Sequence, residues 1–332
     1  MGYKVAVLGA TGAVGSELLT LLEERDFPVD SLRLLASSRS RGKKIRFKGE
    51  DLVVEELTHG SFRGIEIVLS SAGGSISKEF VPSAVQCEAV VVDNTSYFRM
   101  KEDVPLVIPE INPDMIAKHC GIIANPNCST IIMALPAFPL HRAFGIRRIF
   151  AATYQAASGA GRQVMVELEE ETRAVLDGKP YERTVIPHPY AFNLFIHNSR
   201  LHENGYVEEE KKMIHETRKI FREPELRVNA TCVRVPVMRA HSEALNIQFD
   251  RDVSPEEAYE VLRKAPGVQI DEDRDAGRWP MPVDASGKDP VFVGRIRRDV
   301  SQPNTLDLWV VGDQIRKGAA LNAIQIAEQL IR

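Results

Sequence analysis

The stretch YKVAVLGATGAVG, Tyr3–Gly15, decides how the first part of this 332-residue chain folds. Its apolar half, Tyr3–Leu8, is typical of a buried parallel strand, and Val14–Glu24 has the pattern of a helix. Three glycines lie between the strand and the helix. This context favours a dinucleotide-binding loop, because the backbone can approach a pyrophosphate while the helix N-terminus supplies N–H donors. The spacing G-x-x-G-x-x-G also fits a plain tight turn.

Short apolar runs continue this pattern through the first 127 residues. They are Leu32–Ala36, Ile65–Ser70, Ala89–Val92 and Gly121–Ala124. Strands that alternate with helices predict an α/β fold with a doubly wound parallel sheet.

From about residue 146 the strands become longer and partly alternating. These strands are Ile149–Tyr154, Arg227–Arg234, Glu243–Phe249 and Leu306–Val311. Two charged amphipathic helices are expected at Gln163–Leu176 and Glu208–Phe221, and one last helix at Gly318–Leu330. We therefore expect a second, α+β domain with a large mixed, mostly antiparallel sheet.

Charge and cysteine usage exclude several classes of protein. A net charge of −4 without a long basic run argues against nucleic acid or an anionic membrane as the main partner. The four cysteines are irregularly spaced and include no C-x-x-C pair. This argues against a disulfide framework or a metal site and favours a reducing, cytoplasmic compartment. Cys87, Cys120 and Cys232 are expected to be small buried residues.

The end of the second strand indicates which dinucleotide binds. An acid at this point usually holds the ribose 2′-hydroxyl of NAD, but the segment SSRSRGK, 37–43, contains none. Arginine and serine suit the 2′-phosphate of NADP, and the alternative is a solvated basic loop. A second glycine–serine loop, Ser70–Ser75, ends another strand and is expected to cover the other side of the dinucleotide.

A single thiol, Cys128, lies where the apolar run of GIIANPNCST, Gly121–Thr130, changes to an expected helix. The N-terminus of a helix stabilises a thiolate, and we expect Ser129 or Thr130 to cap this helix. In isolation, Cys128 fits a nucleophile and a small buried residue equally well.

A thiol nucleophile needs a partner that handles protons. His241 is the candidate, because RVPVMRAHS, 234–242, joins two strands and carries arginines that suit an anionic substrate. The alternative for His241 is an exposed or structural loop histidine. Arg99 follows another apolar strand in DNTSYFR, 93–99, and is either a phosphate ligand or a surface charge.

Taken together, these segments resemble the aspartate-β-semialdehyde dehydrogenase family over essentially the whole chain. The segments that carry the resemblance are GATGAVG (9–15), SSRSRGK (37–43), DNTSYFRM (93–100), NPNCST (125–130), YQAASGAG (154–161), RVPVMRAHSE (234–243) and DQIRKGAALNAIQIAE (313–328). The resemblance implies a Rossmann-type NADP-binding domain, 1–127, completed by a C-terminal helix, 313–332. It also implies a catalytic and dimerisation domain, 128–312, in a homodimer or homotetramer.

The resemblance also implies a role for each site residue. Cys128 would be the nucleophile, His241 the general acid/base, and Gln155 the residue that orients the intermediate. Arg234 would bind the substrate carboxylate and Glu209 its amino group, although Glu208–Lys212 permits a slip of one residue. The expected phosphate or acyl-phosphate site comprises Ser96, Arg99, Asn127 and Lys212. The expected cofactor-binding residues are Gly9, Thr11, Gly12, Ala13, Val14, Ser37, Arg39, Ser40, Ser71, Ala72, Gly73, Ser158, Gly159 and Asn322.

The implied reaction is the NADP-dependent, reversible reduction of L-aspartyl-4-phosphate to L-aspartate-4-semialdehyde through a cysteine thioester. It would serve the biosynthesis of lysine, threonine, methionine and isoleucine. Two rival interpretations are a related reductase of N-acetylglutamyl phosphate and a noncatalytic NADP-binding paralogue. The intact cysteine, glutamine and histidine argue against the noncatalytic protein.

Overall fold

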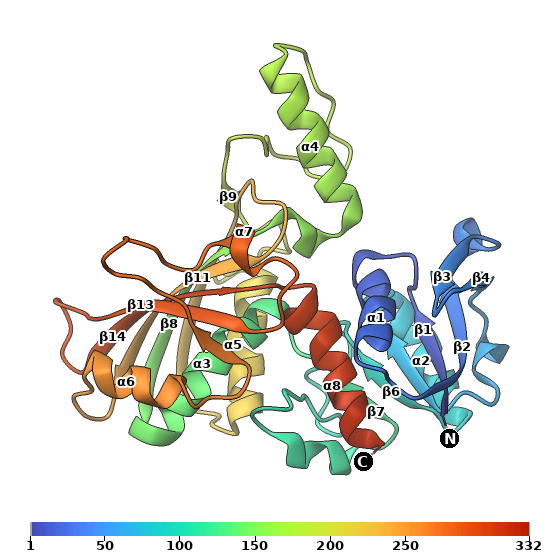
Figure 1. The fold of residues 1–332 in the computed structure, drawn as a ribbon, viewed down its shortest axis with the longest axis horizontal. Coiled ribbons are helices and arrows are strands. Elements are labelled where there is room, and N and C mark those ends of the chain that lie inside the picture. The colour runs from blue at the N-terminus through green and yellow to red at the C-terminus, as the bar shows by residue number, and fades with distance from the viewer. Residues whose placement is uncertain (1, 332) are drawn as a thin grey trace. The chain divides into compact units, whose positions relative to one another are not determined.

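The computed structural model describes residues 2–331, and its backbone contacts divide the chain into two compact units (Figure 1). The first unit comprises Met1–Asn127 together with Ala319–Arg332, and the second comprises Cys128–Gly318. The chain thus returns to its first unit at the C-terminal end. Among the residues described, no helix has the length and apolar character needed to cross a bilayer.

The first unit is built on a seven-stranded sheet in the order β3-β4-β2-β1-β5-β6-β7. Its strands are β1 (Tyr3–Leu8), β2 (Val29–Ala36), β3 (Lys44–Phe47), β4 (Glu50–Glu56), β5 (Ile67–Ser70), β6 (Val90–Asp93) and β7 (Ile122–Ala124). Its α-helices are α1 (Ala13–Glu24), α2 (Gly74–Gln86) and α8 (Leu321–Leu330). All strand pairs are parallel except the edge hairpin β3–β4. The expected doubly wound parallel sheet is confirmed, and the hairpin is an addition to it.

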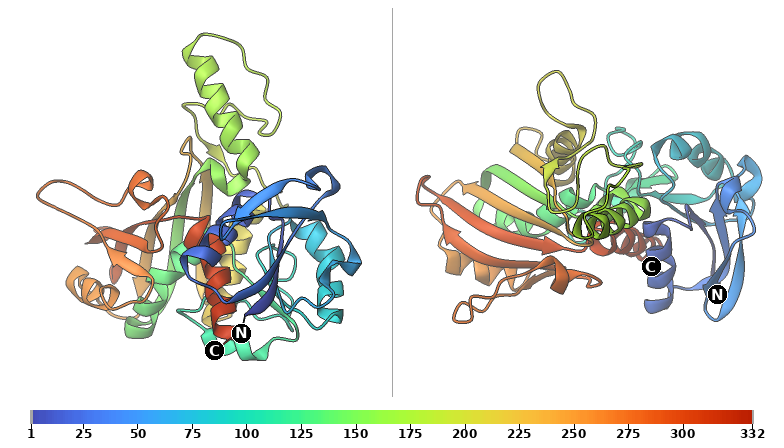
Figure 2. Two further views of the ribbon diagram at one scale, coloured as in Figure 1. Left: turned by 45° about the vertical axis from the view of Figure 1, so that its right-hand side comes forward. Right: turned by 90° about the horizontal axis from the view of Figure 1, so that it is seen from above.

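Buried apolar side chains hold the helices of this unit on the sheet. Leu18 and Leu22 of α1 share one core cluster with Ile324 of α8 and with Val5 and Val7 of β1. α1 and α8 therefore pack on the same face, and α2 lies on the other (Figure 2). The opposite faces of α1 and α2 follow from right-handed crossovers that run in opposite directions along the sheet, from β1 to β2 through α1 and from β5 to β6 through α2.

The second unit is built on a seven-stranded mixed sheet in the order β12-β13-β14-β11-β8-β10-β9. Its strands are β8 (Ile146–Gln155), β9 (Phe195–Ile196), β10 (Arg227–Arg234), β11 (His241–Phe249), β12 (Val268–Ile270), β13 (Val291–Arg298) and β14 (Thr305–Gly312). Its α-helices are α3 (Cys128–Phe144), α4 (Arg162–Leu176), α5 (Glu208–Phe221), α6 (Pro255–Leu262) and α7 (Pro282–Ala285). Four of the six strand pairs are antiparallel, as expected.

Helix α3 is the central helix of the second unit and contacts strands β8, β11, β13 and β14. Its side chains are apolar on nearly all sides and mostly buried, as expected for a helix enclosed by a core. The α4 helix and the chain after it extend away from this sheet (Figures 1 and 2).

Two local expectations were wrong. The last helix is not a single α-helix from Gly318, because Arg316–Ala320 forms a π-helical turn before α8 begins at Leu321. Gly318 N–H donates to Asp313 O, five residues earlier, at 3.1 Å. His241 does not lie in a loop either: it is the first residue of β11.

Candidate active site

The thiol of Cys128 lies at the first residue of α3. Ser129 and Thr130 are therefore inside the first turn and do not cap the helix as expected. The π-helical turn packs directly on this residue, because a side-chain carbon added to Gly318 would lie 3.0 Å from the Cβ of Cys128. The sulfur is thus fixed by the helix N-terminus on one side and by glycine backbone on the other.

The ends of three neighbouring strands bring the other expected catalytic residues together. β8 and β10 run parallel, and their last residues, Gln155 and Arg234, are paired. β11 runs antiparallel to β8 and begins at the same edge with His241. The parallel pair β8–β10 and the antiparallel strand β11 therefore bring Gln155, Arg234 and His241 to one edge of the sheet. In the sequence, Gln155 and Arg234 are 79 positions apart, and Arg234 and His241 are 7 positions apart.

His241 lies 3.6 Å from the thiol, measured from Nε2 to Sγ of Cys128, and its side chain is fully buried. Its other ring nitrogen, Nδ1, accepts the backbone N–H of Ala156 at 3.1 Å. Burial, reinforced by the charge of Arg234, lowers the pKa of His241 to about 3. A neutral ring whose Nδ1 accepts must carry its proton on Nε2. In this state His241 is a hydrogen-bond donor that faces the sulfur.

Gln155 is buried and held by two hydroxyl groups. Its amide nitrogen donates to Oγ of Ser129 at 3.0 Å and to Oγ1 of Thr153 at 3.2 Å. Because Ser129 is adjacent to Cys128, these contacts fix the amide next to the thiol.

Arg234 is a buried cation, with 4% of its surface exposed. Its Nη1 donates to the carbonyl oxygen of Ala156 at 3.2 Å, and its Nη2 lies 2.8 Å from Nε2 of His197. Within residues 2–331, its buried Nε has no hydrogen-bond partner. A buried guanidinium with unused donor capacity fits an anionic ligand.

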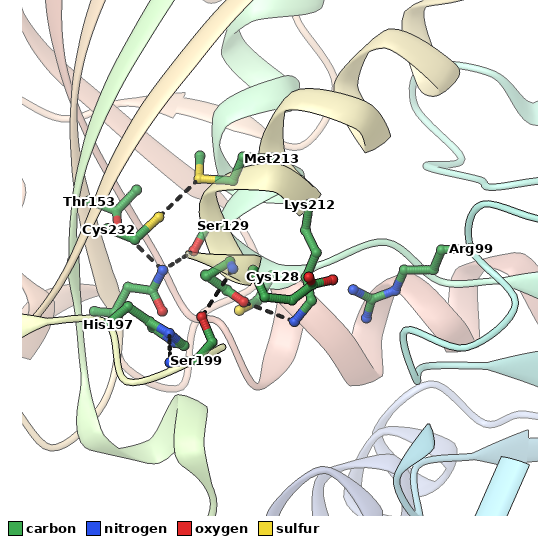
Figure 3. Close-up of polar contacts among 12 residues, drawn as sticks. Arg99, Cys128, Ser129, Thr153, His197, Ser199, Lys212, Met213 and Cys232 are labelled. Atoms are coloured by element: carbon green, nitrogen blue, oxygen red, sulfur yellow. Dashed lines mark hydrogen bonds and ion pairs between the residues drawn. The ribbon is translucent and has the colours of Figure 1, made fainter. Parts of the chain in front are cut away.

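Helix α5 carries Glu209 and Lys212 on one face, as their spacing predicts. Nζ of Lys212 contacts Oε2 of Glu209 at 3.1 Å, and Oγ of Ser199 accepts the backbone N–H of Glu209 (Figure 3). The neighbouring acids face other groups: Glu208 contacts His202 at 2.6 Å, and Glu210 accepts the N–H groups of Val207 and Cys232. This geometry favours Glu209 over its neighbours for the expected role.

The loops of the first unit follow neighbouring strands and meet at the carboxyl edge of the sheet, where nucleotides bind in such folds. Gly9 follows β1 with a φ of +85°, and a Cβ on it would approach the backbone of Ser71 and Ala72, after β5, to about 3.0 Å. A Cβ on Gly15 would lie 2.1 Å from the Gly9 oxygen. The two loops therefore pack closely enough to exclude side chains.

The same edge holds the remaining expected cofactor residues of this unit. Gly12, Ala13 and Val14 form the N-terminus of α1, where no side chain caps the free N–H groups. Ser37 and Arg39 follow β2 and are exposed, whereas Ser40 is buried with its Oγ 3.4 Å from Oγ1 of Thr11. Gly73 precedes α2. Two open helix N-termini and an exposed arginine fit a dinucleotide with an additional phosphate.

Asn322 is fully buried, and its amide nitrogen donates to Val107 O at 2.9 Å and Asn125 Oδ1 at 2.6 Å. These contacts link α8 to the loops after β6 and β7. They give Asn322 a structural role in the first unit, besides the cofactor role expected of it.

The expected phosphate residues of the first unit follow β6 and β7. Ser96 is exposed, whereas Arg99 and Asn127 are largely buried. Nε of Arg99 donates to Asn125 O at 2.9 Å and its Nη2 to Asn94 O at 2.8 Å. Backbone carbonyls thus orient this guanidinium.

Ser158 and Gly159 lie in the turn after β8. Oγ of the buried Ser158 accepts the amide of Gln314, whose Oε1 accepts the N–H of Ala240 at 2.8 Å. A Cβ on Gly159 would lie 2.9 Å from the ring of His241 and 3.2 Å from Nη1 of Arg234. Gly159 is thus needed for close packing over these two side chains.

The other cysteines differ in their surroundings. Cys232 is buried, and burial raises its pKa. Cys120 is exposed and Cys87 half-buried, so the expectation that all three are buried was wrong for Cys120.

Several residues that support this site were not expected as site residues from the sequence. Ser129, Thr153, His197, Ser199 and Gln314 all contact expected site residues. Only Thr153 could have been found by pattern, because alternation along β8 puts it on the same face as Gln155.

Two family models match the chain: "Semialdehyde dehydrogenase, NAD binding domain" over residues 4–119 and "Semialdehyde dehydrogenase, dimerisation domain" over residues 138–317. An aspartate-semialdehyde dehydrogenase from Synechocystis sp. is 55% identical over 328 residues, which cover 99% of this chain and 97% of the relative. The chain belongs to the aspartate-semialdehyde dehydrogenase family. The expected family and fold class are confirmed, and the protein is an oxidoreductase of this family.

Solved structures agree with this assignment. Aspartate semialdehyde dehydrogenase II from Vibrio cholerae, complexed with ASA, is 45% identical, with a TM-score of 0.97 over 100% of this chain and 99% of that chain. The Candida albicans enzyme, solved with NADP, is 27% identical, with a TM-score of 0.76 over 100% and 99% of the two chains. These likenesses support the dehydrogenase over both rival interpretations.

Proposed function

We propose that this protein interconverts L-aspartate-4-semialdehyde and L-aspartyl-4-phosphate, with NADP as its cofactor and Cys128 as the nucleophile. The observation that carries the proposal is the 3.6 Å contact between Sγ of Cys128 and Nε2 of His241. It joins a thiol at a helix N-terminus to a buried donor, and both features favour the thiolate.

The thiolate attacks the aldehyde carbon, and negative charge develops on the aldehyde oxygen. The Nε2–H of His241 stabilises this charge, and Gln155, whose amide is held by Ser129 and Thr153, orients the intermediate. When bound, NADP accepts the hydride in this direction and supplies it in the other. The resulting thioester on Cys128 is attacked by phosphate, which releases the acyl phosphate and restores the thiolate. The proton that hydrogen phosphate loses in this step is released to solvent.

The substrate is recognised at both its charged ends. Arg234 binds the α-carboxylate, and Glu209 accepts hydrogen bonds from the α-amino group. Ser96, Arg99, Asn127 and Lys212 bind phosphate and the acyl phosphate. The first-unit loops and the second-unit residues Ser158 and Gly159 bind the cofactor.

Assembly is proposed to be homodimeric, through the face of the second-unit sheet opposite α3. This face carries Tyr154, which is 38% exposed, and Trp309, whose ring centroid lies 5.7 Å from that of Tyr154. A matching dimerisation-domain model supports the dimer, and a tetramer of such dimers is the larger alternative. The enzyme is proposed to act in the cytoplasm, consistent with its irregularly spaced free cysteines.

The test is phosphate-dependent formation of NADPH from aspartate semialdehyde, compared between wild type and Cys128→Ala. We expect wild type to turn over and Cys128→Ala to lose at least about 10³-fold in kcat, because no other group can form the thioester. Cys120→Ala removes an exposed thiol and is the matched control. Unchanged turnover in Cys128→Ala, or activity only with N-acetylglutamate semialdehyde, would overturn the proposal.

A further inference from the structure

His197 lies beside the proposed carboxylate-binding arginine because of a very short strand. β9 pairs antiparallel with the end of β10, with Phe195 opposite Arg234. The backbone N–H of His197 continues this pairing and donates to Cys232 O at 2.8 Å. The side chain is 8% exposed, and its Nε2 lies 2.8 Å from Nη2 of Arg234 (Figure 3).

The hydrogen bond between these two side chains has only one direction. A guanidinium is always protonated and can only donate, so Nε2 of His197 must accept. The ring must therefore be neutral. Burial, together with the charge of Arg234, lowers the pKa of His197 to about 4, which is consistent with this state. Nδ1 faces a second donor, the N–H of Ser199 at 3.2 Å, but a neutral ring can accept at only one nitrogen. The guanidinium, which is charged and closer, therefore makes Nε2 the acceptor, and the ring proton lies on Nδ1.

Because His197 is a neutral acceptor, it does not neutralise the positive charge of Arg234. An acid at this position would fix the guanidinium but also neutralise it, which would weaken its attraction for a substrate carboxylate. Among residues 2–331, Arg234 forms ion pairs with no aspartate or glutamate, and its remaining contact is with the carbonyl of Ala156. His197 thus orients the cation and preserves its charge.

The chain around His197 also reaches the other proposed substrate group. Ser199, two residues later, accepts the backbone N–H of Glu209 at 3.1 Å. One short segment therefore contacts both the residue proposed for the α-carboxylate and the residue proposed for the α-amino group.

We propose that His197 is a positioning residue that holds the guanidinium of Arg234 in the orientation required by the α-carboxylate of the substrate. The inference rests on the proposed function. It assigns His197 to substrate affinity and not to the chemistry at Cys128.

The test compares His197→Leu, which removes the acceptor, with His197→Gln, whose amide oxygen can accept from Arg234. We expect His197→Leu to raise KM for aspartate semialdehyde at least tenfold, with kcat changed less than about threefold and KM for phosphate unchanged. His197→Gln should recover most of this loss. His215→Gln, at an exposed histidine of α5 in the same unit, is the matched control. Circular dichroism and the rate of Cys128 alkylation by iodoacetamide report whether each variant is folded.

A double-mutant cycle separates a positioning role from general damage to the site. If His197 acts through Arg234, adding His197→Leu to Arg234→Ala should change KM less than about twofold. An equal KM effect in both backgrounds, a fall in kcat alone, or a wild-type KM in folded His197→Leu would overturn the inference while leaving the proposed function in place. Absence of wild-type turnover with aspartate semialdehyde would instead overturn the proposed function.

Discussion

At the scale of single residues, the environment of His241 decides what its ring can do. Nδ1 accepts from the backbone of Ala156, so the ring proton faces Cys128. To take a proton at Nε2, the ring would first have to place its own proton on Nδ1, opposite an N–H donor. The geometry therefore favours the donor half of the acid/base role expected from the family.

A donor role for His241 predicts different effects for two substitutions, His241→Gln and His241→Asn. The amide nitrogen of His241→Gln can reach the position of Nε2, whereas that of His241→Asn is too short. We expect kcat to fall at least about 10³-fold in His241→Asn and roughly tenfold less in His241→Gln. Steady-state kinetics with aspartate semialdehyde, phosphate and NADP⁺ measure both. Equal losses in the two variants would argue for a base instead of a donor.

A second buried titratable group, Glu243, lies two residues farther along β11. Its side chain is fully buried, and neither carboxyl oxygen has a hydrogen-bond partner in the described residues. Burial raises the pKa of Glu243 well above its usual value. The folded protein therefore keeps a proton on this group at pH values where the unfolded chain has lost it.

The free energy of unfolding should therefore depend on pH through Glu243. Above about pH 4.5, the folded state binds one more proton at Glu243 than the unfolded state, so this group lowers stability as pH rises to its folded pKa, by about 1.4 kcal/mol per pH unit. Glu243→Gln keeps the shape of the neutral acid without titrating. We expect its advantage over wild type to be near zero at pH 4.5 and to grow toward pH 7 in urea unfolding. A constant difference would contradict the assignment.

At the scale of elements, the turn of the β3–β4 hairpin has only a weak signal in the sequence. Phe47 and Glu50 pair across a two-residue loop, and both loop residues, Lys48 and Gly49, have positive φ. This is the type I′ geometry that Asn-Gly usually signals. Lys-Gly gives a weaker signal, so the hairpin was not predicted.

This turn leads to a prediction about the free energy of unfolding of the first unit. Gly49 has a φ of +85°, and no atom lies within 4 Å of the position that a Cβ would take, so Gly49→Ala adds conformational strain without a clash. We expect a loss of about 1–2 kcal/mol in the free energy of unfolding. Gly60→Ala is the matched control, because its φ is ordinary and its Cβ would meet only Oγ1 of Thr58 at 3.8 Å. Urea denaturation should show no loss, or a small gain, for the control.

At the scale of the whole molecule, the uncovered face of the second-unit sheet bears on assembly. α3 packs against one face, and alternation along β8 puts Gln155 on that face and Tyr154 on the other. This sheet face carries the aromatic pair Tyr154 and Trp309 together with polar side chains such as Asn246, and it suits a second copy of the chain.

The proposed dimer should be sensitive to a charge on this face. We expect Tyr154→Asp to halve the molar mass measured by light scattering, because an unpaired carboxylate would be buried at the interface. Val53→Asp places the same charge on an exposed strand position of the first unit and should leave the mass unchanged. An unchanged mass for Tyr154→Asp would place the interface elsewhere.

The sequence determined much of the first unit, because parallel strands and their glycine loops are local features. Tyr3–Leu8 and the glycines after it predicted β1 and the start of α1 to within one residue. The π-helical turn at Arg316–Ala320 was not predictable, because its packing of Gly318 on Cys128 depends on residues 190 positions apart.

For the site, the sequence by itself determined the kinds of groups present: a thiol at a helix start, a histidine among arginines and loops that suit a dinucleotide. Only the tertiary structure decided their chemical states. The proton position on His241 is set by the amide of Ala156, and the orientation of Arg234 by His197. These contacts join strand ends that are distant in sequence, and hydrogen-bond direction depends on positions in space that no local pattern encodes.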